Sequence, residues 1–265
     1  MRNSIGNKLT YPSEICPKFF EVRKYLINRI FDLGDSLDLQ SITLQCAIIY
    51  IEVLLNVGKL DIIDKDKDLW SVTALQLAWK YIELDDHIPF IKEYRRLLDC
   101  RSYTTDIFIK SERVLLKALK WDLMVITPLH FTSWILNHCV LFGDDKVKII
   151  DQRGQDSYRY VSNIEFEYEK QKRDQMTQIV HSVKKYAEFF WDIAIQSFEI
   201  QKFTYAVQGL YAVLAAREVL WIKPVWNKQL DQFTGLNKHK IKEDIQEVSD
   251  SERHIFVMLW FRLSS

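Results

Sequence analysis

Apolar residues recur along most of this chain at the three- and four-residue intervals that characterise the buried face of a helix. The residues Leu44, Ile48, Ile51 and Leu55 stand at positions i, i+4, i+7 and i+11, and apolar residues fill most of the places between them. A helix that is apolar around its whole circumference packs against other helices on several sides. The pattern therefore predicts a helix over residues 37–55 at the centre of a bundle.

Three further helices are predicted in the first half of the chain, over residues 18–34, 69–84 and 104–119. Gly34 is the expected C-terminal stop of the first of them, and Thr104 or Thr105 is the expected N-cap of the third. Within 69–84, small residues line one strip and allow neighbouring helices to approach closely: Ser71, Ala74 and Ala78. These elements predict a compact helical unit.

The second half of the chain repeats this order and spacing. Helices are predicted over residues 129–142, 183–198, 204–220, 225–233 and 240–248, with an additional helix over 252–263. The third helix of this series again carries a strip of small residues: Ala206, Gly209, Ala212 and Ala216. The sequence therefore predicts an all-α protein built from a duplicated helical unit.

A polar segment over residues 143–174 interrupts the helical pattern. The runs 146–150 and 157–161 flank the turn signal Gln152-Arg153-Gly154, which predicts either a β-hairpin or a mobile loop. We favour a solvated insertion over a docking element as the role of this segment.

The composition supports a helical protein and excludes several classes. Gly and Pro number only 7 and 5, which argues against a turn-rich sandwich or barrel. The 36 basic and 36 acidic side chains cancel, so no direct binding of nucleic acid is expected. No apolar run approaches the roughly 18 residues of a membrane span, and no signal peptide is recognisable. The 4 cysteines lie far apart, as in a soluble intracellular protein with reduced thiols.

Residues with catalytic or metal-binding potential are scattered. The run Asp64-Lys65-Asp66-Lys67-Asp68 begins like a calcium loop, but Leu69 stands where the turn needs Gly and Leu75 stands where a bidentate Glu belongs. The 6 histidines form no metal-binding spacing, and the chain has neither a phosphate-binding Gly-rich loop nor a nucleophile elbow. We expect no enzyme activity, metal, cofactor or small-molecule ligand.

Several segments resemble the cyclin box. The sequences LQCAIIYIE (44–52) and VTALQLAWKYIE (72–83) are similar to its second and third helices. Residues 103–104, 111–123 and 127–131 resemble its fifth helix and the linker into a second box, and 185–189 and 226–227 resemble the C-terminal cyclin fold. The likeness covers about residues 18–142 and 176–250, in order and at similar spacing.

The resemblance implies two tandem five-helix cyclin folds. Their expected bounds are 18–127 and 128–250, with the insertion at about 143–175, an N-terminal extension over 1–17 and a C-terminal helix over 251–265. It also implies a non-catalytic subunit that binds a cyclin-dependent protein kinase and activates it by pushing its C-helix inward. A role in cell-cycle control and cell division is preferred over transcription, in the nucleus, the cytoplasm or both.

The resemblance further suggests which residues face the kinase. By motif position, Lys80 and Glu112 match a charged pair that hydrogen-bonds backbone groups around the kinase C-helix. Four more residues fall where the family supplies apolar contacts: Tyr81, Leu116, Trp121 and Leu123. Taken alone, Lys80 is an ordinary helix-end lysine and Glu112 a solvated helix residue, and Trp121 and Leu123 suit a core between the two boxes equally well.

The first predicted helix resembles a substrate-docking helix of the family in part. Its matching residues are Val22, Arg23, Tyr25 and Leu26, whereas Arg29 occupies the aromatic position. The matching place at Lys67-Asp68 is also charged, which argues against an apolar docking groove. We expect Arg23 to pair with a carboxylate within the fold.

Two alternatives remain at this stage. A tandem cyclin-fold transcription factor would use the same helices to hold DNA, but such a protein needs a basic face, and the class usually carries an N-terminal zinc ribbon. A helical scaffold that has lost its kinase-binding surface is the other alternative.

Overall fold

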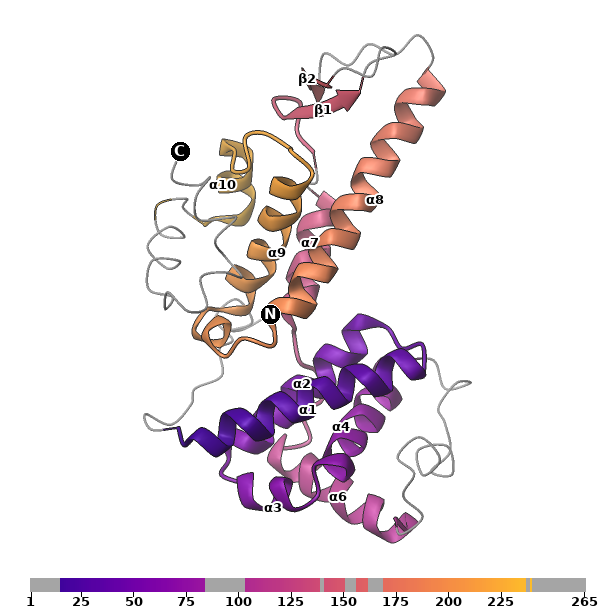
Figure 1. Cartoon of the computed structure of the whole chain (residues 1–265), viewed down its shortest axis with the longest axis vertical. Helices are drawn as coiled ribbons and strands as arrows, with labels where there is room; N and C mark the ends of the chain where they lie inside the picture. Colours follow the sequence, from indigo (N-terminus) through magenta and orange to yellow (C-terminus); the bar gives the residue numbers. More distant parts are fainter. Residues whose placement is uncertain are drawn as a thin grey trace. The chain divides into compact units, whose positions relative to one another are not determined.

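The computed structural model describes residues 15–83, 103–138, 141–150, 156–161, 169–236 and 239 (Figure 1). Helices dominate these residues, and the predicted all-α architecture is confirmed, with one small hairpin added. The described elements fall into two compact units, and the boundary between the units in the sequence lies between Thr127 and Pro128. The helices predicted over 240–248 and 252–263 lie outside the described residues.

The described part of the first unit consists of α1 (Pro17–Ser36), α2 (Ser41–Asn56), α3 (Leu60–Lys65), α4 (Lys67–Ile82) and α6 (Thr105–Ala118). Helix α2 packs against α1, α4 and α6, and every side chain from Thr43 to Glu52 is buried. The prediction of a central helix is thus confirmed, although the helix begins at Ser41. Glu83 accepts hydrogen bonds from the backbone N–H of Gln40 at 3.1 Å and from the Thr43 hydroxyl at 2.6 Å, which places a carboxylate at the positive end of the helix dipole.

Gly34 has a different role from the one predicted. Helix α1 continues through it to Ser36, so the prediction of a stop at Gly34 is wrong. A Cβ atom at this position would lie 2.2 Å from Cδ2 of Leu44. The close approach of α1 and α2 therefore favours glycine at this position, and no turn is involved.

The charged run 64–68 spans the junction of two helices. Helix α3 ends at Lys65, and the side chain of Asp66 accepts a hydrogen bond from the Leu69 N–H at 3.1 Å. Asp66 is thus the N-cap of α4. A short helix here was not predicted, because six residues carry too little periodicity to detect.

The second unit contains α7 (Pro128–His138), β1 (Lys146–Ile150), β2 (Asp156–Tyr160), α8 (Glu169–Ala194), the 3₁₀ turn η3 (Glu199–Lys202), α9 (Tyr205–Val219) and α10 (Lys228–Thr234). Helix α9 packs against α7 and α8. A Cβ atom at Gly209 would lie 2.5 Å from the Pro128 carbonyl oxygen, and the Thr132 hydroxyl donates to the Gly209 carbonyl at 3.1 Å. The predicted small-residue strip is confirmed at this position as the contact between α7 and α9.

The insertion forms an antiparallel hairpin, in which β1 pairs with β2 from Lys146↔Tyr160 to Ile150↔Asp156. This agrees with the predicted hairpin. Asp145 and Val147 at the hairpin base are buried, so the insertion is anchored there, while the preference for a solvated insertion over a docking element stays a prediction. Helix α8 begins at Glu169, well before the predicted start at Val183. The prediction missed the first turns of this helix because they are polar and carry no apolar stripe.

Candidate partner-binding surface

Lys80 and Glu112 are joined by an ion pair at the surface of the first unit. The Lys80 Nζ atom lies 2.8 Å from Oε1 and 3.1 Å from Oε2 of Glu112. Lys80 stands in the last turn of α4, and Glu112 stands in α6. The hydroxyl oxygens of Thr73 and Ser111, buried between the same two helices, are 2.8 Å apart and fix their register. The fold therefore brings together two residues that are 32 positions apart.

This ion pair has hydrogen-bonding capacity left for a partner. Both side chains remain partly exposed, so water screens the attraction and the pair contributes only about 0–1 kcal/mol to folding. An ammonium group has three donors, and each carboxylate oxygen can accept a second hydrogen bond. The pair can thus donate to a carbonyl oxygen and accept from an N–H of a neighbouring backbone.

Exposed apolar side chains accompany the pair. Trp121 is 68% exposed and Met124 is 69% exposed, in the segment that follows α6, and Tyr81 is exposed directly after Lys80. Leu123 is half-buried, and Leu116 is buried in the helix bundle. The sequence indicated all of these residues except Met124, which lies in a non-helical segment where periodicity gives no signal.

Backbone geometry directs Trp121 outward. Lys120 and Trp121 both adopt the left-handed conformation, with φ of 54° and 64°, which bulky residues rarely adopt. The Trp121 N–H donates to the Leu116 carbonyl oxygen at 2.9 Å and closes the end of α6. A large indole is thereby held at the surface on a fixed backbone.

The segment after α6 is tied to α2 through Tyr50. The Tyr50 hydroxyl donates to the Leu123 carbonyl oxygen at 2.8 Å. Burial raises the pKa of Tyr50, and Cys46, Tyr81 and Asp122 raise it further. The segment that carries Trp121 and Met124 is therefore anchored to the central helix of the first unit. We call the set Lys80, Tyr81, Glu112, Trp121, Leu123 and Met124 the α4–α6 surface.

The predicted docking helix is divided between the core and the surface. Val22, Arg23 and Leu26 are buried. The Arg23 Nε atom lies 2.6 Å from Oε1 of Glu52, and both side chains are almost fully buried, which confirms the expected internal ion pair. These three residues stabilise the bundle and are not available to a docking peptide in this structure.

The other two docking residues lie at the surface and bind a carboxylate. Tyr25 and Arg29 both donate to Oδ1 of Asp68, at 3.1 Å and 2.8 Å. The Lys67 ammonium lies 5.5 Å from the centre of the Tyr25 ring. The surface between α1 and α4 around these residues is thus a network of charged and polar groups.

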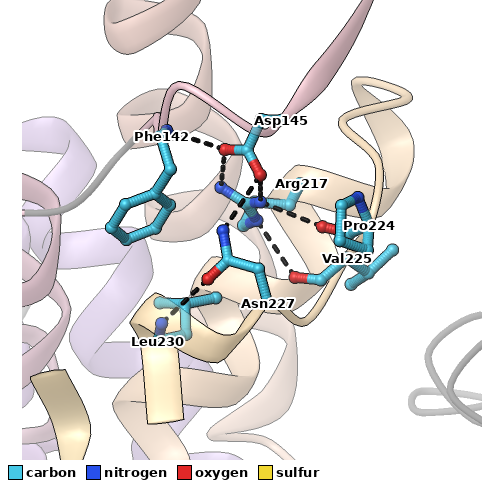
Figure 2. Close-up of polar contacts among 7 residues, drawn as sticks. All are labelled: Phe142, Asp145, Arg217, Pro224, Val225, Asn227 and Leu230. Carbon is cyan, nitrogen blue, oxygen red and sulfur yellow. Dashed lines mark hydrogen bonds and ion pairs between the residues drawn. The ribbon is translucent and has the colours of Figure 1, made fainter. Parts of the chain in front are cut away.

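In the second unit, a buried ion pair joins Arg217 of α9 to Asp145 at the base of the hairpin (Figure 2). The Arg217 NH1 and NH2 atoms donate to the two oxygens of Asp145 at 3.0 Å and 2.7 Å. The guanidinium also donates to the Val225 and Pro224 carbonyl oxygens, both at 3.0 Å. The Asn227 amide donates to Oδ1 of Asp145 at 3.1 Å, and its own oxygen accepts the Leu230 N–H at the start of α10. This cluster was not predicted, and its one available signal was an arginine within a largely apolar helix.

In the ranges that the structure describes, no group of three or more His, Cys, Asp or Glu side chains could hold a metal ion. Asp64 of the 64–68 run forms ion pairs with two lysines, Lys18 at 2.7 Å and Lys67 at 3.1 Å. Among the described helices, none is long and apolar enough to cross a membrane.

Comparison with known proteins relates the first unit to a known family. The family described as "Cyclin, N-terminal domain" matches residues 12–124, the stretch that holds the α4–α6 surface. The predicted resemblance to the cyclin family is thus confirmed for this part of the chain. A viral cyclin from herpesvirus saimiri shares the fold, with a TM-score of 0.53 and 11% identity over 96% of this chain and 87% of the viral chain.

Two curated relatives carry cyclin names. Mouse cyclin-J-like protein is 23% identical over 180 residues, which are 66% of this chain and 41% of the mouse protein. The G2/mitotic-specific cyclin S13-6 of Glycine max is 23% identical over 222 residues, which are 84% of this chain and 39% of the plant protein. The matched region thus spans less than half of either relative.

Proposed function

We propose that this chain is a cyclin, a non-catalytic regulatory subunit that binds a cyclin-dependent protein kinase through the α4–α6 surface. The observation that supports this most is the partly exposed Lys80–Glu112 pair, together with the exposed Trp121 and Met124 in the segment that follows α6. Interface energy concentrates in large apolar anchors and in charged groups that become desolvated on binding. The α4–α6 surface supplies both within one unit.

The pair would act by hydrogen-bonding to backbone groups of the kinase. The Lys80 ammonium would donate to carbonyl oxygens at the end of a kinase helix, and Glu112 would accept from N–H groups of the adjoining segment. Trp121, Tyr81 and Met124 would cover the apolar flank of the same kinase element. Buried under a partner, each charge would gain strength, because water no longer screens it.

Activation would follow from a difference in affinity. An active kinase needs its C-helix placed so that a Lys–Glu pair positions ATP. A partner that binds this arrangement more tightly than the inactive one shifts the population toward activity by that difference. The proposed role is in cell-cycle control, in the nucleus or cytoplasm, and the name of the mitotic plant relative supports it.

The test is reconstitution with a panel of purified cyclin-dependent kinases. The full chain should co-purify with at least one kinase and raise phosphorylation of a peptide substrate. Lys80→Glu should abolish both effects, whereas Lys110→Glu, which alters another exposed lysine close to Glu112 in sequence, should preserve them. Failure of every kinase to bind, or equal binding by both variants, would refute the proposal.

A further inference from the structure

Cationic side chains form a row along one side of α6. Lys110, Arg113 and Lys117 are all exposed. At 3.6 residues per turn, these three positions fall within an arc of roughly 60° around the helix axis. Phe108 and Leu115 lie on the opposite side of the helix and are buried in the bundle. We call Lys110, Arg113 and Lys117 the α6 basic row.

The acidic residues of the same segment do not neutralise the α6 basic row. In the part of the chain that the structure describes, none of the three cations forms an ion pair. Glu112 pairs instead with Lys80, at 2.8 Å. Asp106 lies in the first turn of α6, one turn before the row, where the helix dipole stabilises its carboxylate. The second and third cations of the row lie two and three turns from Asp106, roughly 10 Å and 16 Å along the axis, so salt largely screens its charge from them.

Exposed apolar side chains border the α6 basic row on both sides. Ile109 is 40% exposed and Val114 is 37% exposed. Each of these positions lies roughly 40° beyond one edge of the row around the helix axis. A protein surface that combines charged and apolar side chains matches this arrangement, whereas the phosphates of a nucleic acid match only the cations.

From these observations we propose that the α6 basic row binds an acidic helix of a partner protein, which packs alongside α6. Asp or Glu residues at three- and four-residue intervals on that helix repeat the spacing of the row, which rises roughly 4.5 Å and then roughly 6 Å along the axis. Each carboxylate would then meet one cation. Apolar residues beside the carboxylates would cover Ile109 and Val114.

The charge of the whole first unit favours a short acidic helix over a polyanion. Residues 9–127 hold 18 acidic and 16 basic side chains. Duplex DNA or an anionic membrane would therefore meet net repulsion beyond the row. A helix of a few turns contacts the row alone and avoids this repulsion.

The proposed site is separate from the proposed kinase surface, although both involve α6. Glu112 lies roughly 140° around the helix from Lys117. The double variant Lys110→Glu/Lys117→Glu should therefore still capture the kinase, and Lys80→Glu should still bind the acidic helix. The two proposals can fail separately.

The first test compares two synthetic helical peptides of identical composition on the full chain, by fluorescence anisotropy. One peptide carries Glu residues on a single face, at three- and four-residue intervals, with leucines beside them. In the other peptide the same residues are distributed around the helix. We expect the one-face peptide to bind about tenfold more tightly or better, a difference of about 1.4 kcal/mol. Equal affinities would show that only net charge matters and would overturn the proposal.

The second test reverses charges within the row. Lys110→Glu/Lys117→Glu should weaken binding of the one-face peptide about tenfold or more. The matched control Lys184→Glu/Lys185→Glu changes exposed positions of α8 and alters the net charge by the same amount, so it should bind the peptide normally. Equal affinities of the two double variants would contradict binding at the row.

Cross-linking locates the peptide on the unaltered chain, so the result does not depend on how a variant folds. A carbodiimide joins carboxylates to nearby lysine amines, and mass spectrometry should find the one-face peptide joined mainly to Lys110 and Lys117. Cross-links mainly to lysines of the second unit, such as Lys184, would place the peptide elsewhere. Tighter binding of a short DNA duplex, lost in Lys110→Glu/Lys117→Glu, would assign the row to nucleic acid. Either result would overturn the proposal.

Discussion

Arg217 and Asp145 form a two-point ion pair with both side chains fully buried, although 72 positions separate them in the sequence. The pair joins the base of the hairpin to α9, and through Asn227 to the start of α10. Its hydrogen bonds satisfy both charged groups, which makes burial tolerable. Each partner therefore depends on the other.

Asp145→Ala should strongly destabilise the second unit. The substitution leaves the Arg217 guanidinium buried without its counter-charge, which costs about 3–5 kcal/mol. Chemical denaturation followed by circular dichroism measures the loss. Lys202→Ala is the control, because it removes an exposed ion pair with Glu199 and should cost less than about 1 kcal/mol. Similar small losses for both variants would mean that the buried pair does not form.

The Arg23–Glu52 pair in the first unit should behave as a coupled unit. Arg23→Met alone leaves Glu52 charged and buried, and should cost about 3–5 kcal/mol. The double variant Arg23→Met/Glu52→Leu removes both charges and should recover most of that loss. A double-mutant cycle by urea denaturation yields the coupling energy, and additive effects would contradict the assigned contact.

Three glycines should respond differently to replacement by alanine. At Gly209 the new Cβ would meet the Pro128 carbonyl oxygen at 2.5 Å, a backbone atom that cannot move alone, so we expect a loss near the upper end of about 1–3 kcal/mol. At Gly34 it would meet the flexible end of Leu44, so the loss should be smaller. At Gly58 nothing is near, and only the positive φ of 78° opposes alanine, with a cost of about 1 kcal/mol. Thermal melting of the three variants checks that Gly209→Ala is the least stable of them. A melting temperature of Gly58→Ala below that of Gly209→Ala would contradict this prediction.

Cys46 should resist thiol reagents. Burial raises its pKa to about 12, so at pH 8 the group is the neutral thiol and not the reactive thiolate. Cys16 is exposed and should react. Labelling with iodoacetamide followed by peptide mass spectrometry compares the two sites. Rapid labelling of Cys46 in the folded protein would show that α2 is not the buried helix described above.

The sequence predicted a helix well wherever apolar residues are dense or clearly periodic. The ranges 204–220 and 104–119 match α9 and the amphipathic α6 to within one residue at each end, whereas the range 37–55 began four residues before α2. The start of α8 was missed, because its polar first turns are indistinguishable from a loop. The role of Gly34 was misjudged for a related reason, since a close helix contact leaves no local trace in the sequence.

Tertiary contacts could be predicted only where a family pattern related distant residues. The resemblance to the cyclin box paired Lys80 with Glu112, and the structure brings their side chains to 2.8 Å. No such pattern related Asp145 to Arg217, and their contact depends on the path of the chain between them. Met124 was missed because an exposed apolar residue outside a helix follows no period.

The charge-swapped variant Lys80→Glu/Glu112→Lys provides the most direct test of kinase binding through the α4–α6 surface. The swap keeps an ion pair between α4 and α6, so the melting temperature should stay nearly unchanged, but it inverts the charges offered to the kinase backbone. Titration calorimetry with a kinase captured by the unaltered chain should show affinity reduced at least about a hundredfold, or roughly 2.7 kcal/mol. Affinity equal to that of the unaltered chain would show that the pair acts only within the fold, and would contradict the proposed function of this surface.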